Sequence, residues 1–417
     1  MTPSESELLR TRSLQDADVQ EDPTPYHHAL HQQPIHFDAR LGFYICSTYE
    51  LMRRILRDPE SFSNVDSQRV DGLRQPPPEV LALRRSGYPP VNTLVTNDPP
   101  SHTRIRRMVD EPFRPRRIDA LKSSIRDIVD ETVDAVAARG ACEAVADLAV
   151  PIPVRVIADM LGLHRNLAPQ IKVWSDASVA PLGLMVSDAR LIECAQLMRE
   201  FQDVMAAELE SRRQNPRDDL LSGLVSARDE HGQGLSMAEM LSLTQQFLVA
   251  GNETTTNAIA AGIQLLAAHP DQYRRLQQRA DDRVLKTFAN EVLRLESPVQ
   301  GLFRVVTRDT RLADVTLPAG ARIMLRFAAA NRDPEQYPEP DRLDVERGNS
   351  ATHLAFGAGI HHCIGASLAR EELVATFDVL LERTRNLRLA PHREPPRHHP
   401  SIALRGLERL DVEFDPA

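Results

Sequence analysis

The feature that most constrains the fold of this chain is a helical periodicity of apolar residues that recurs along most of its length. Across residues 117–139 the apolar positions fall on one face of a helix, namely Ile118, Leu121, Ile125, Ile128, Val129 and Val133. Similar amphipathic stretches cover residues 151–163, 190–212, 217–227, 237–268, 271–278, 282–295 and 366–384. Pieces with strand character are short, at residues 36–43, 303–306, 311–317, 321–325 and in the C-terminal tail. The sequence therefore predicts a mainly α fold with a small β region, in which Pro318, Ala319 and Gly320 form a hairpin turn.

Charge and cysteine content narrow the class of protein. The 417 residues carry a net charge of −9, which argues against a general nucleic-acid binder because phosphate binding needs a basic face. Cys46, Cys142, Cys194 and Cys363 lack the spacing of a disulfide framework. No basic N-terminal patch precedes an apolar run, and no apolar run reaches the length of a membrane span. We therefore expect a cytoplasmic protein without a membrane anchor.

One of the four cysteines lies in an unusual, glycine-rich setting. Gly357, Gly359 and Gly365 surround Cys363, and a helical stretch begins directly after Gly365. Free N–H groups at the start of a helix stabilise a thiolate, and a thiolate held by such donors suits the axial position of a haem iron. Two other interpretations stay open from the residues alone, a small buried thiol and a zinc site of unusual spacing. The candidate zinc ligands are His353, His361, His362 and Cys363.

The residues from Phe356 to Gly365 resemble the haem-binding signature of the cytochrome P450 monooxygenases, Phe-Gly-x-Gly-x-His-x-Cys-x-Gly, at every fixed position. The resemblance implies that haem b is the cofactor and that Cys363 is the proximal thiolate ligand of its iron. It also implies that His361 hydrogen-bonds a haem propionate and that Phe356, Gly357 and Gly365 belong to the haem-binding loop.

A polar turn interrupts the longest helical pattern. Gly251 and the threonines at 254–256 are poor helix formers, and the Thr254 hydroxyl can bond back to the Ala250 carbonyl. The neighbouring Glu253 carboxyl can exchange protons. The residues alone also fit a solvated polar turn. The string Ala-Gly-x-Glu-Thr-Thr resembles the oxygen-binding helix of the P450 family, which implies that Ala250 belongs to the haem site and that Thr254 and Glu253 are catalytic residues supporting proton delivery.

Cationic residues elsewhere in the chain suit the carboxylates of a haem. His102 and Arg106 lie four residues apart on one face of a helix that prolines open, and Arg offers a carboxylate a bidentate fork. The resemblance implies that this pair and Arg304 bind haem propionates.

A second charged pair has a structural interpretation. Glu291 and Arg294, three residues apart, share a helix face on which an ion pair forms easily. The resemblance implies that they join a third residue, identified as Arg342, in a scaffold cluster.

The resemblance as a whole implies a haem-thiolate monooxygenase that hydroxylates or epoxidises a hydrophobic small molecule. The candidate substrates are a terpenoid, a steroid, a fatty acid or an aromatic compound, which suit a mostly apolar pocket. The pocket residues expected from the family are Gln246, Val249, Ala250, Val299, Gln300 and Leu302, together with a proline-rich stretch over residues 64–97 that has little periodicity.

Electrons are expected from separate partners, a ferredoxin and its reductase, because the chain has no flavin or nicotinamide fingerprint and no iron–sulfur cysteine run. Arginines at positions 104, 107, 114, 116 and 117 are a candidate docking patch, although a solvated face explains them equally well.

No repeat or linker marks a domain boundary, so we expect one haem domain over residues 1–417, without a fused reductase, as a monomer, with residues 1–25 as a candidate disordered segment. Two alternative functions remain, a non-catalytic haem-thiolate gas sensor and a peroxide-driven haem-thiolate enzyme. The presence of Glu253 and Thr254 argues against both.

Overall fold

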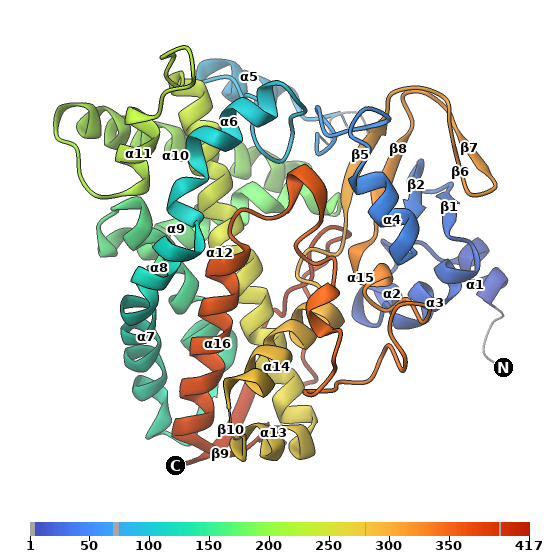
Figure 1. Cartoon of the computed structure of the whole chain (residues 1–417), viewed down its shortest axis with the longest axis vertical. Helices are drawn as coiled ribbons and strands as arrows, with labels where there is room; N and C mark the ends of the chain where they lie inside the picture. The colour runs from blue at the N-terminus through green and yellow to red at the C-terminus, as the bar shows by residue number, and fades with distance from the viewer. Residues whose placement is uncertain (1–4, 70–74, 280, 392) are drawn as a thin grey trace.

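Helices form most of the computed structural model, which describes residues 5–69, 75–279, 281–391 and 393–417 (Figure 1). The α-helices are α1 (Glu5–Thr11), α2 (Ala17–Glu21), α3 (Thr24–Gln32), α4 (Tyr49–Leu56), α5 (Pro78–Ser86), α6 (Ser101–Val109), α7 (Pro115–Ala137), α8 (Pro151–Leu161), α9 (Ala168–Val179), α10 (Asp188–Gln214), α11 (Leu220–Ser226), α12 (Met237–Ala268), α13 (Pro270–Gln277), α14 (Asp282–Glu296), α15 (Phe327–Ala330) and α16 (Ala366–Arg383). The predicted periodic stretches are confirmed as helices within a few residues, and α12 begins and ends where the pattern does.

Within the described residues the strands form three small sheets, and the mainly α prediction is confirmed. A five-stranded sheet has the order β1 (Ile35–Asp38), β2 (Phe43–Cys46), β8 (Arg322–Leu325), β5 (Leu302–Val306) and β3 (Phe62–Ser63). It lies beside the N-terminal helices in Figure 1. A three-stranded sheet joins β4 (Ala141–Glu143), β10 (Asp411–Pro416) and β9 (Thr384–Leu389), and β6 (Thr310–Leu312) pairs with β7 (Val315–Leu317).

Three strand and turn predictions are wrong in detail. Residues 36–43 contain the turn between β1 and β2, where Gly42 has a positive φ of 75°. Residues 311–317 fold back as the β6–β7 hairpin, because Ala313 adopts a positive φ of 50°. The turn at Pro318–Gly320 connects β7 to β8, which belong to different sheets, so it closes no hairpin.

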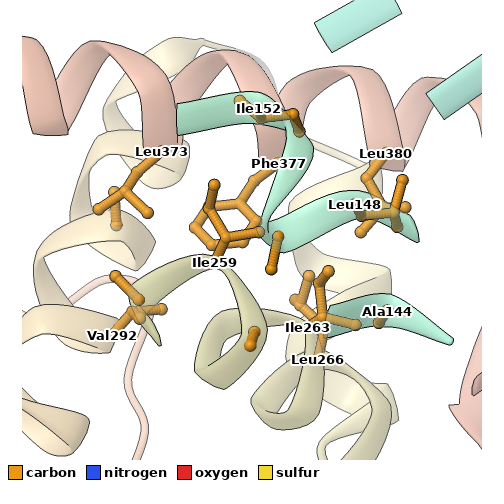
Figure 2. Close-up of a cluster of buried hydrophobic side chains, with 14 of the residues drawn as sticks. Ala144, Leu148, Ile152, Ile259, Ile263, Leu266, Val292, Leu373, Phe377 and Leu380 are labelled. Carbon is orange, nitrogen blue, oxygen red and sulfur yellow. The ribbon is translucent and has the colours of Figure 1, made fainter. Parts of the chain in front are cut away.

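The core packs around α12, the longest helix. Its residues Ile259, Ile263 and Leu266 meet Phe377 of α16 and Val292 of α14, among others (Figure 2). A Cβ atom on Gly262 would lie only 2.2 Å from the Phe377 ring, so the absence of a side chain there lets α12 and α16 approach closely. This contact positions α16, which begins three residues after Cys363.

The structure also revises the segments expected to be irregular. Residues 5–25 contain α1, α2 and the start of α3, and Leu9, Leu14 and Val19 are buried, which contradicts disorder in this part of residues 1–25. Residues 1–4 lie outside the described residues. The stretch over residues 64–97 contains helix α5, which begins at a proline, while residues 70–74 are likewise outside the described residues.

The scaffold cluster on α14 has a different third member from the one predicted. Glu291 and Arg294 are fully buried, and the Arg294 guanidinium donates to both Glu291 oxygens at 2.6 and 3.0 Å. The third side chain is Arg347, whose Nε lies 3.1 Å from the Glu291 carboxylate. Arg342 instead points outward, pairs with exposed Glu339 at 2.9 Å and contributes only its backbone carbonyl to the cluster. The prediction of Arg342 is wrong because arginines five residues apart in an irregular segment are indistinguishable by spacing.

Candidate active site

A cavity of about 260 Å³ lies between α12, the loop that precedes α16, and strand β5. It gathers most of the predicted site residues, which come from segments far apart in the chain. Those that line it are Gln246, Ala250, Thr254, His102, Arg106, Val299, Leu302, Arg304, Phe356, Gly357, His361, Cys363 and Gly365. Two predicted pocket residues do not line it. Gln300 is buried elsewhere, where its amide binds Arg326, and Val249 packs against apolar residues on another side of α12.

Backbone contacts hold the loop around Cys363. The Cys363 N–H donates to the Phe356 carbonyl at 2.9 Å, and the Arg106 guanidinium donates to the His362 carbonyl at 3.1 Å, which ties the loop to α6. Gly359 has a φ of +70°, and a Cβ atom there would lie 2.5 Å from the Leu56 carbonyl oxygen. The glycine spacing noted in the sequence therefore reflects both a left-handed turn and a close approach to α4.

The surroundings of Cys363 shift the pKa of its thiol in opposite directions. Burial raises its pKa, while the Gly365 backbone N–H, Arg106 and Arg370 lower it. A positively charged ion bound to the sulfur would lower the pKa further and favour the thiolate. The side chain thus has the electropositive surroundings that a thiolate ligand needs.

Several polar groups that face this cavity have no hydrogen-bond partner among the described residues. These are both buried ring nitrogens of His102 and the Nε2 of His361, which lies 4.0 Å from the Asp98 carboxylate. The two rings lie 4.3 Å apart, and burial lowers the pKa of His361 to about 3. Arg304 is also buried, donates to the Phe303 carbonyl at 2.8 Å, and has its pKa lowered to about 10 by burial. Unpaired buried donors are costly, so this set fits a ligand that presents carboxylates.

The turn of α12 beside the cavity has the predicted back-bond. The Thr254 hydroxyl donates to the Ala250 carbonyl at 2.9 Å, and both residues line the cavity. The hydroxyl is thereby held at the cavity wall with its lone pairs available to a small ligand.

Glu253 turns away from the cavity. It is buried, and its carboxylate pairs with Lys172 of α9 at 3.3 Å; Lys172 also pairs with Asp176. Burial raises the pKa of Glu253, whereas Lys172 lowers it. Lys172 and Asp176 are both partly exposed, so the carboxylate communicates with solvent through this pair.

One acidic residue of the cavity was missed by the sequence reading. Glu372 of α16 lines the cavity, is almost wholly buried, and its Oε2 has no hydrogen-bond partner. Burial raises its pKa well above the ordinary value and thereby favours the neutral carboxyl over the carboxylate. Its four-residue spacing from buried Leu368 is the signal that places it on the inner face of α16.

Comparison with known proteins identifies the family. The sequence model described as cytochrome P450 matches residues 179–406, more than half of the chain. The chain belongs to the cytochrome P450 family. It is 37% identical over 326 residues to the cytochrome P450 monooxygenase PikC of Streptomyces venezuelae, covering 78% of this chain and 76% of that protein. It is 34% identical to the steroid C26-monooxygenase of Mycobacterium tuberculosis, covering 92% and 98%.

Solved structures agree with the sequence comparisons. Cytochrome P450 CYP109Q5 from Chondromyces apiculatus superposes with a TM-score of 0.84 at 33% identity, covering 97% of this chain and 98% of that one. This P450 is therefore an oxidoreductase of the monooxygenase class with haem b as its cofactor, and the unpaired donors of the cavity fit the propionates of that group.

Two other possibilities can be weighed against the described residues. Within them, no three His, Cys, Asp or Glu side chains gather closely enough to hold a metal ion, so the zinc interpretation has no support. In the same part of the chain, no helix is both long and apolar enough to cross a bilayer.

Proposed function

We propose that this P450 is a haem-thiolate monooxygenase in which the Cys363 thiolate would hold the haem iron. The observation that supports it most is the meeting, in one cavity, of Cys363 with the buried guanidinium of Arg304 and with ring nitrogens of His102 and His361 that lack a hydrogen-bond partner among the described residues. When bound, the haem supplies the activation of O₂, of which one atom enters the substrate and the other leaves as water. The protein binds the haem, orients the substrate and delivers protons.

The haem carboxylates would be bound by residues on three different elements. His102 and Arg106 come from α6, Arg304 from β5 and His361 from the loop before α16. Carboxylates placed there would satisfy the ring nitrogens that the protein leaves unpaired and would neutralise the buried guanidinium of Arg304. Phe356, Gly357, Gly365 and Ala250 complete the walls of the same cavity.

Proton delivery would use Thr254 and Glu253 in different positions. The Thr254 hydroxyl lies at the cavity wall, where its lone pairs can accept a hydrogen bond while its proton is donated to the Ala250 carbonyl. Glu253 receives protons on the solvent side through Lys172 and Asp176. A side-chain rotation of Glu253 away from Lys172 would bring its proton toward the Thr254 turn.

Electrons would come from a ferredoxin with its reductase, docking near the cysteine loop. Arg104 pairs with Glu239 and Asp229, Arg114 with Asp110, and Arg117 with Glu111, so much of the predicted basic patch is already neutralised. Among the described ion pairs none involves Arg107 or Arg116, and both side chains are exposed. We therefore propose these two arginines, beside the Arg106–His362 contact, as the docking cations for an acidic ferredoxin. The cytoplasmic location, the single domain and the monomeric state stay predictions.

The substrate would be a hydrophobic small molecule that is hydroxylated or epoxidised. Gln246, Val299 and Leu302 line the cavity together with Phe247 and Leu94. The substrate side of the cavity is thus largely apolar and carries the amides of Gln246 and Asn64. The relatives include a steroid monooxygenase, which agrees with a compound of this hydrophobic class. Terpenoids, steroids, fatty acids and aromatic compounds all remain candidates at this level.

Isotope incorporation tests the monooxygenase reaction directly. Haem-loaded protein, a surrogate ferredoxin and reductase, and a compound selected by displacement of the iron-bound water would be supplied with ¹⁸O₂. The proposal expects one labelled oxygen atom in each product molecule. Product oxygen drawn from water, or no product although the haem is reduced, would contradict it and favour a sensor.

Replacing Thr254 by Ala tests the proton path. We expect the variant to bind haem normally but to lose at least about tenfold in product formed per electron consumed, with the difference appearing as peroxide, as for loss of general-acid assistance. Thr244 is the matched control, because it makes the same back-bond to Met240 at 2.8 Å on the same helix but lies outside the cavity. Equal coupling in Thr254→Ala and Thr244→Ala would remove Thr254 from the mechanism.

A further inference from the structure

The segment that connects α14 to β5 forms one wall of the cavity that contains Cys363. Its residues Pro298 and Val299 line the cavity, and so does Leu302, the first residue of β5. Gln300 lies between them but does not line the cavity, and only 2% of its surface is exposed. The direction that Gln300 takes therefore decides which of its neighbours face a bound ligand.

Arg326 holds the Gln300 side chain from behind this wall. It follows β8 directly and precedes α15, which packs against α3 (Figure 1). Its guanidinium donates through Nη2 to the Gln300 side-chain oxygen at 2.8 Å and through Nη1 to the Ile402 carbonyl, also at 2.8 Å. Its Nε donates to Nε2 of His27 in α3 at 3.1 Å. One side chain thus joins the wall, the N-terminal helices and the C-terminal part of the chain.

The Gln300 amide passes this contact on to the wall. Its nitrogen donates to the carbonyls of Glu296 and Ser297, both at 2.8 Å, and its oxygen accepts from Arg326. The Gln300 backbone N–H donates to the Ala403 carbonyl at 2.7 Å. Because both ends of the amide are bound, the two apolar neighbours of Gln300 keep their direction toward the cavity.

The loop of residues 401–405 supports the wall a second time. Its Ile402 carbonyl accepts from Arg326, and its Arg405 N–H donates to the Pro298 carbonyl at 3.0 Å. On the side of β8 the wall is packed closely, since a Cβ atom on Gly301 would lie 2.9 Å from the Leu325 carbonyl oxygen. Arg326 is therefore bonded both to the wall and to the loop that supports it.

The charge of Arg326 has no carboxylate partner in the part of the chain that the structure describes. The side chain is buried, burial lowers its pKa to about 9, and none of the ion pairs among the described residues includes it. A buried charge without a counter-ion is costly, and an apolar side chain of similar size would avoid this cost. The guanidinium provides instead three directed hydrogen bonds to three separate segments.

We propose that Arg326 is a positioning residue for the substrate. By holding the Gln300 side chain away from the cavity, it sets the position of Val299 and Leu302 and thereby determines which hydrophobic compounds fit. Arg326 does not line the cavity, so it acts on the substrate only through the wall. This inference rests on the proposed monooxygenase function and adds a specificity-determining residue to it.

Two ligands of the haem iron test the proposal. Haem-loaded protein would be titrated with imidazole, which needs room only at the iron, and with 4-phenylimidazole, whose phenyl group extends to the cavity walls. The Soret shift is the readout. Arg326→Met should leave the affinity for imidazole within about twofold and weaken that for 4-phenylimidazole by about fivefold or more. The ratio of the two affinities is measured on folded holoprotein, so an arginine that only stabilises the fold would leave it unchanged.

Gln300→Leu breaks the same contact from the other side and keeps Arg326. It should change the ratio in the same direction, which also tests the proposal if Arg326→Met does not fold. In the variant that combines both substitutions, the change should be smaller than the product of the two single changes, as expected for residues that act through one contact.

Arg279→Met is the matched control. Arg279 is a mostly buried arginine that pairs with Asp378, donates to the Leu276 carbonyl at 3.0 Å and lies outside the cavity. Its ratio should equal that of the unchanged protein. The proposal is overturned if Arg326→Met and Gln300→Leu leave the ratio unchanged, if Arg279→Met changes it equally, or if the two single changes multiply in the combined variant. Binding of imidazole to the iron in the same samples separates this failure from failure of the haem site itself.

Discussion

Two buried glutamates on neighbouring helices show how differently this fold uses the same side chain. Glu291 of α14 accepts from Arg294, Arg347 and the Asp344 N–H, and its side chain is wholly inaccessible. Glu253 of α12 has one cationic partner, Lys172, which reaches solvent. A carboxylate whose hydrogen-bonding positions are all occupied cannot reorient, whereas a carboxylate with a single, partly exposed partner can change its orientation and its protonation state. Glu291 therefore has a structural role, and Glu253 is free to take part in proton transfer.

The largest effect should come from breaking the saturated cluster. Glu291→Ala would leave two buried guanidinium groups without their carboxylate, which costs about 3–5 kcal/mol. We expect loss of most folded holoprotein, measured by haem content and by urea unfolding of what remains. Arg342→Ala is the control, since Arg342 belongs to an exposed pair and should change stability by less than about 1 kcal/mol. An equal loss of stability in the two variants would show that the Arg342 side chain belongs to the buried cluster.

Glu372 extends the comparison to a carboxyl with no cationic partner. Burial raises its pKa well above 4.5, so the native state keeps a proton that the unfolded chain releases. The stability that the Glu372 proton contributes is therefore fully present below pH 4.5 and is lost, by up to about 1.4 kcal/mol per pH unit, as pH rises toward the native pKa. Gln cannot ionise, so Glu372→Gln should lose less stability than the unchanged protein as pH rises above 4.5 in thermal unfolding of the holoprotein.

The neighbouring Glu371 provides the control for this pH dependence. Its side chain is more accessible than that of Glu372, and its Oε2 lies 3.7 Å from Lys122 Nζ of α7. Glu371→Gln should leave the slope of stability against pH unchanged. Parallel slopes for all three proteins would show that Glu372 is ionised in the native state.

The smallest predicted effect concerns the pH profile set by Glu253. Lys172 lowers the pKa of Glu253 and Asp176 raises it, against the dominant effect of burial, which raises it. Lys172→Met should therefore shift the alkaline limb of coupled turnover, where Glu253 loses its proton, to higher pH, and Asp176→Asn should shift it to lower pH. Movement of this limb in the same direction in both variants, or in neither, would contradict a role for the Glu253 proton.

The helical core was more predictable than the site. Periodicity located α7, α8, α10, α12, α14 and α16, because each packs an apolar face against the core. It missed α5 and α9, which are shorter and both pack against α10. The resemblance to the family predicted a shared site for Cys363, His361 and Thr254, and all three line one cavity. Spacing could not show that Glu253 faces Lys172, because the partner is distant in sequence and the direction of a side chain depends on packing.

The same limit explains the errors at Arg342 and Gln300. Both lie in irregular segments, where adjacent residues point in directions that tertiary hydrogen bonds decide. Gln300 binds Arg326 and the carbonyls of Glu296 and Ser297, which turns it away from the cavity that Val299 and Leu302 line. Glu372 was missed for the opposite reason, since an acidic residue in a charged run was not expected on a buried face.

The absorption spectrum of the reduced holoprotein with carbon monoxide tests the central claim, that Cys363 is the thiolate ligand, most directly. The account predicts the strongly red-shifted Soret band that thiolate ligation produces, and its loss in Cys363→His while Cys46→Ala, a change at a buried thiol outside the cavity, retains it. A spectrum typical of histidine ligation in the unchanged protein would contradict the account.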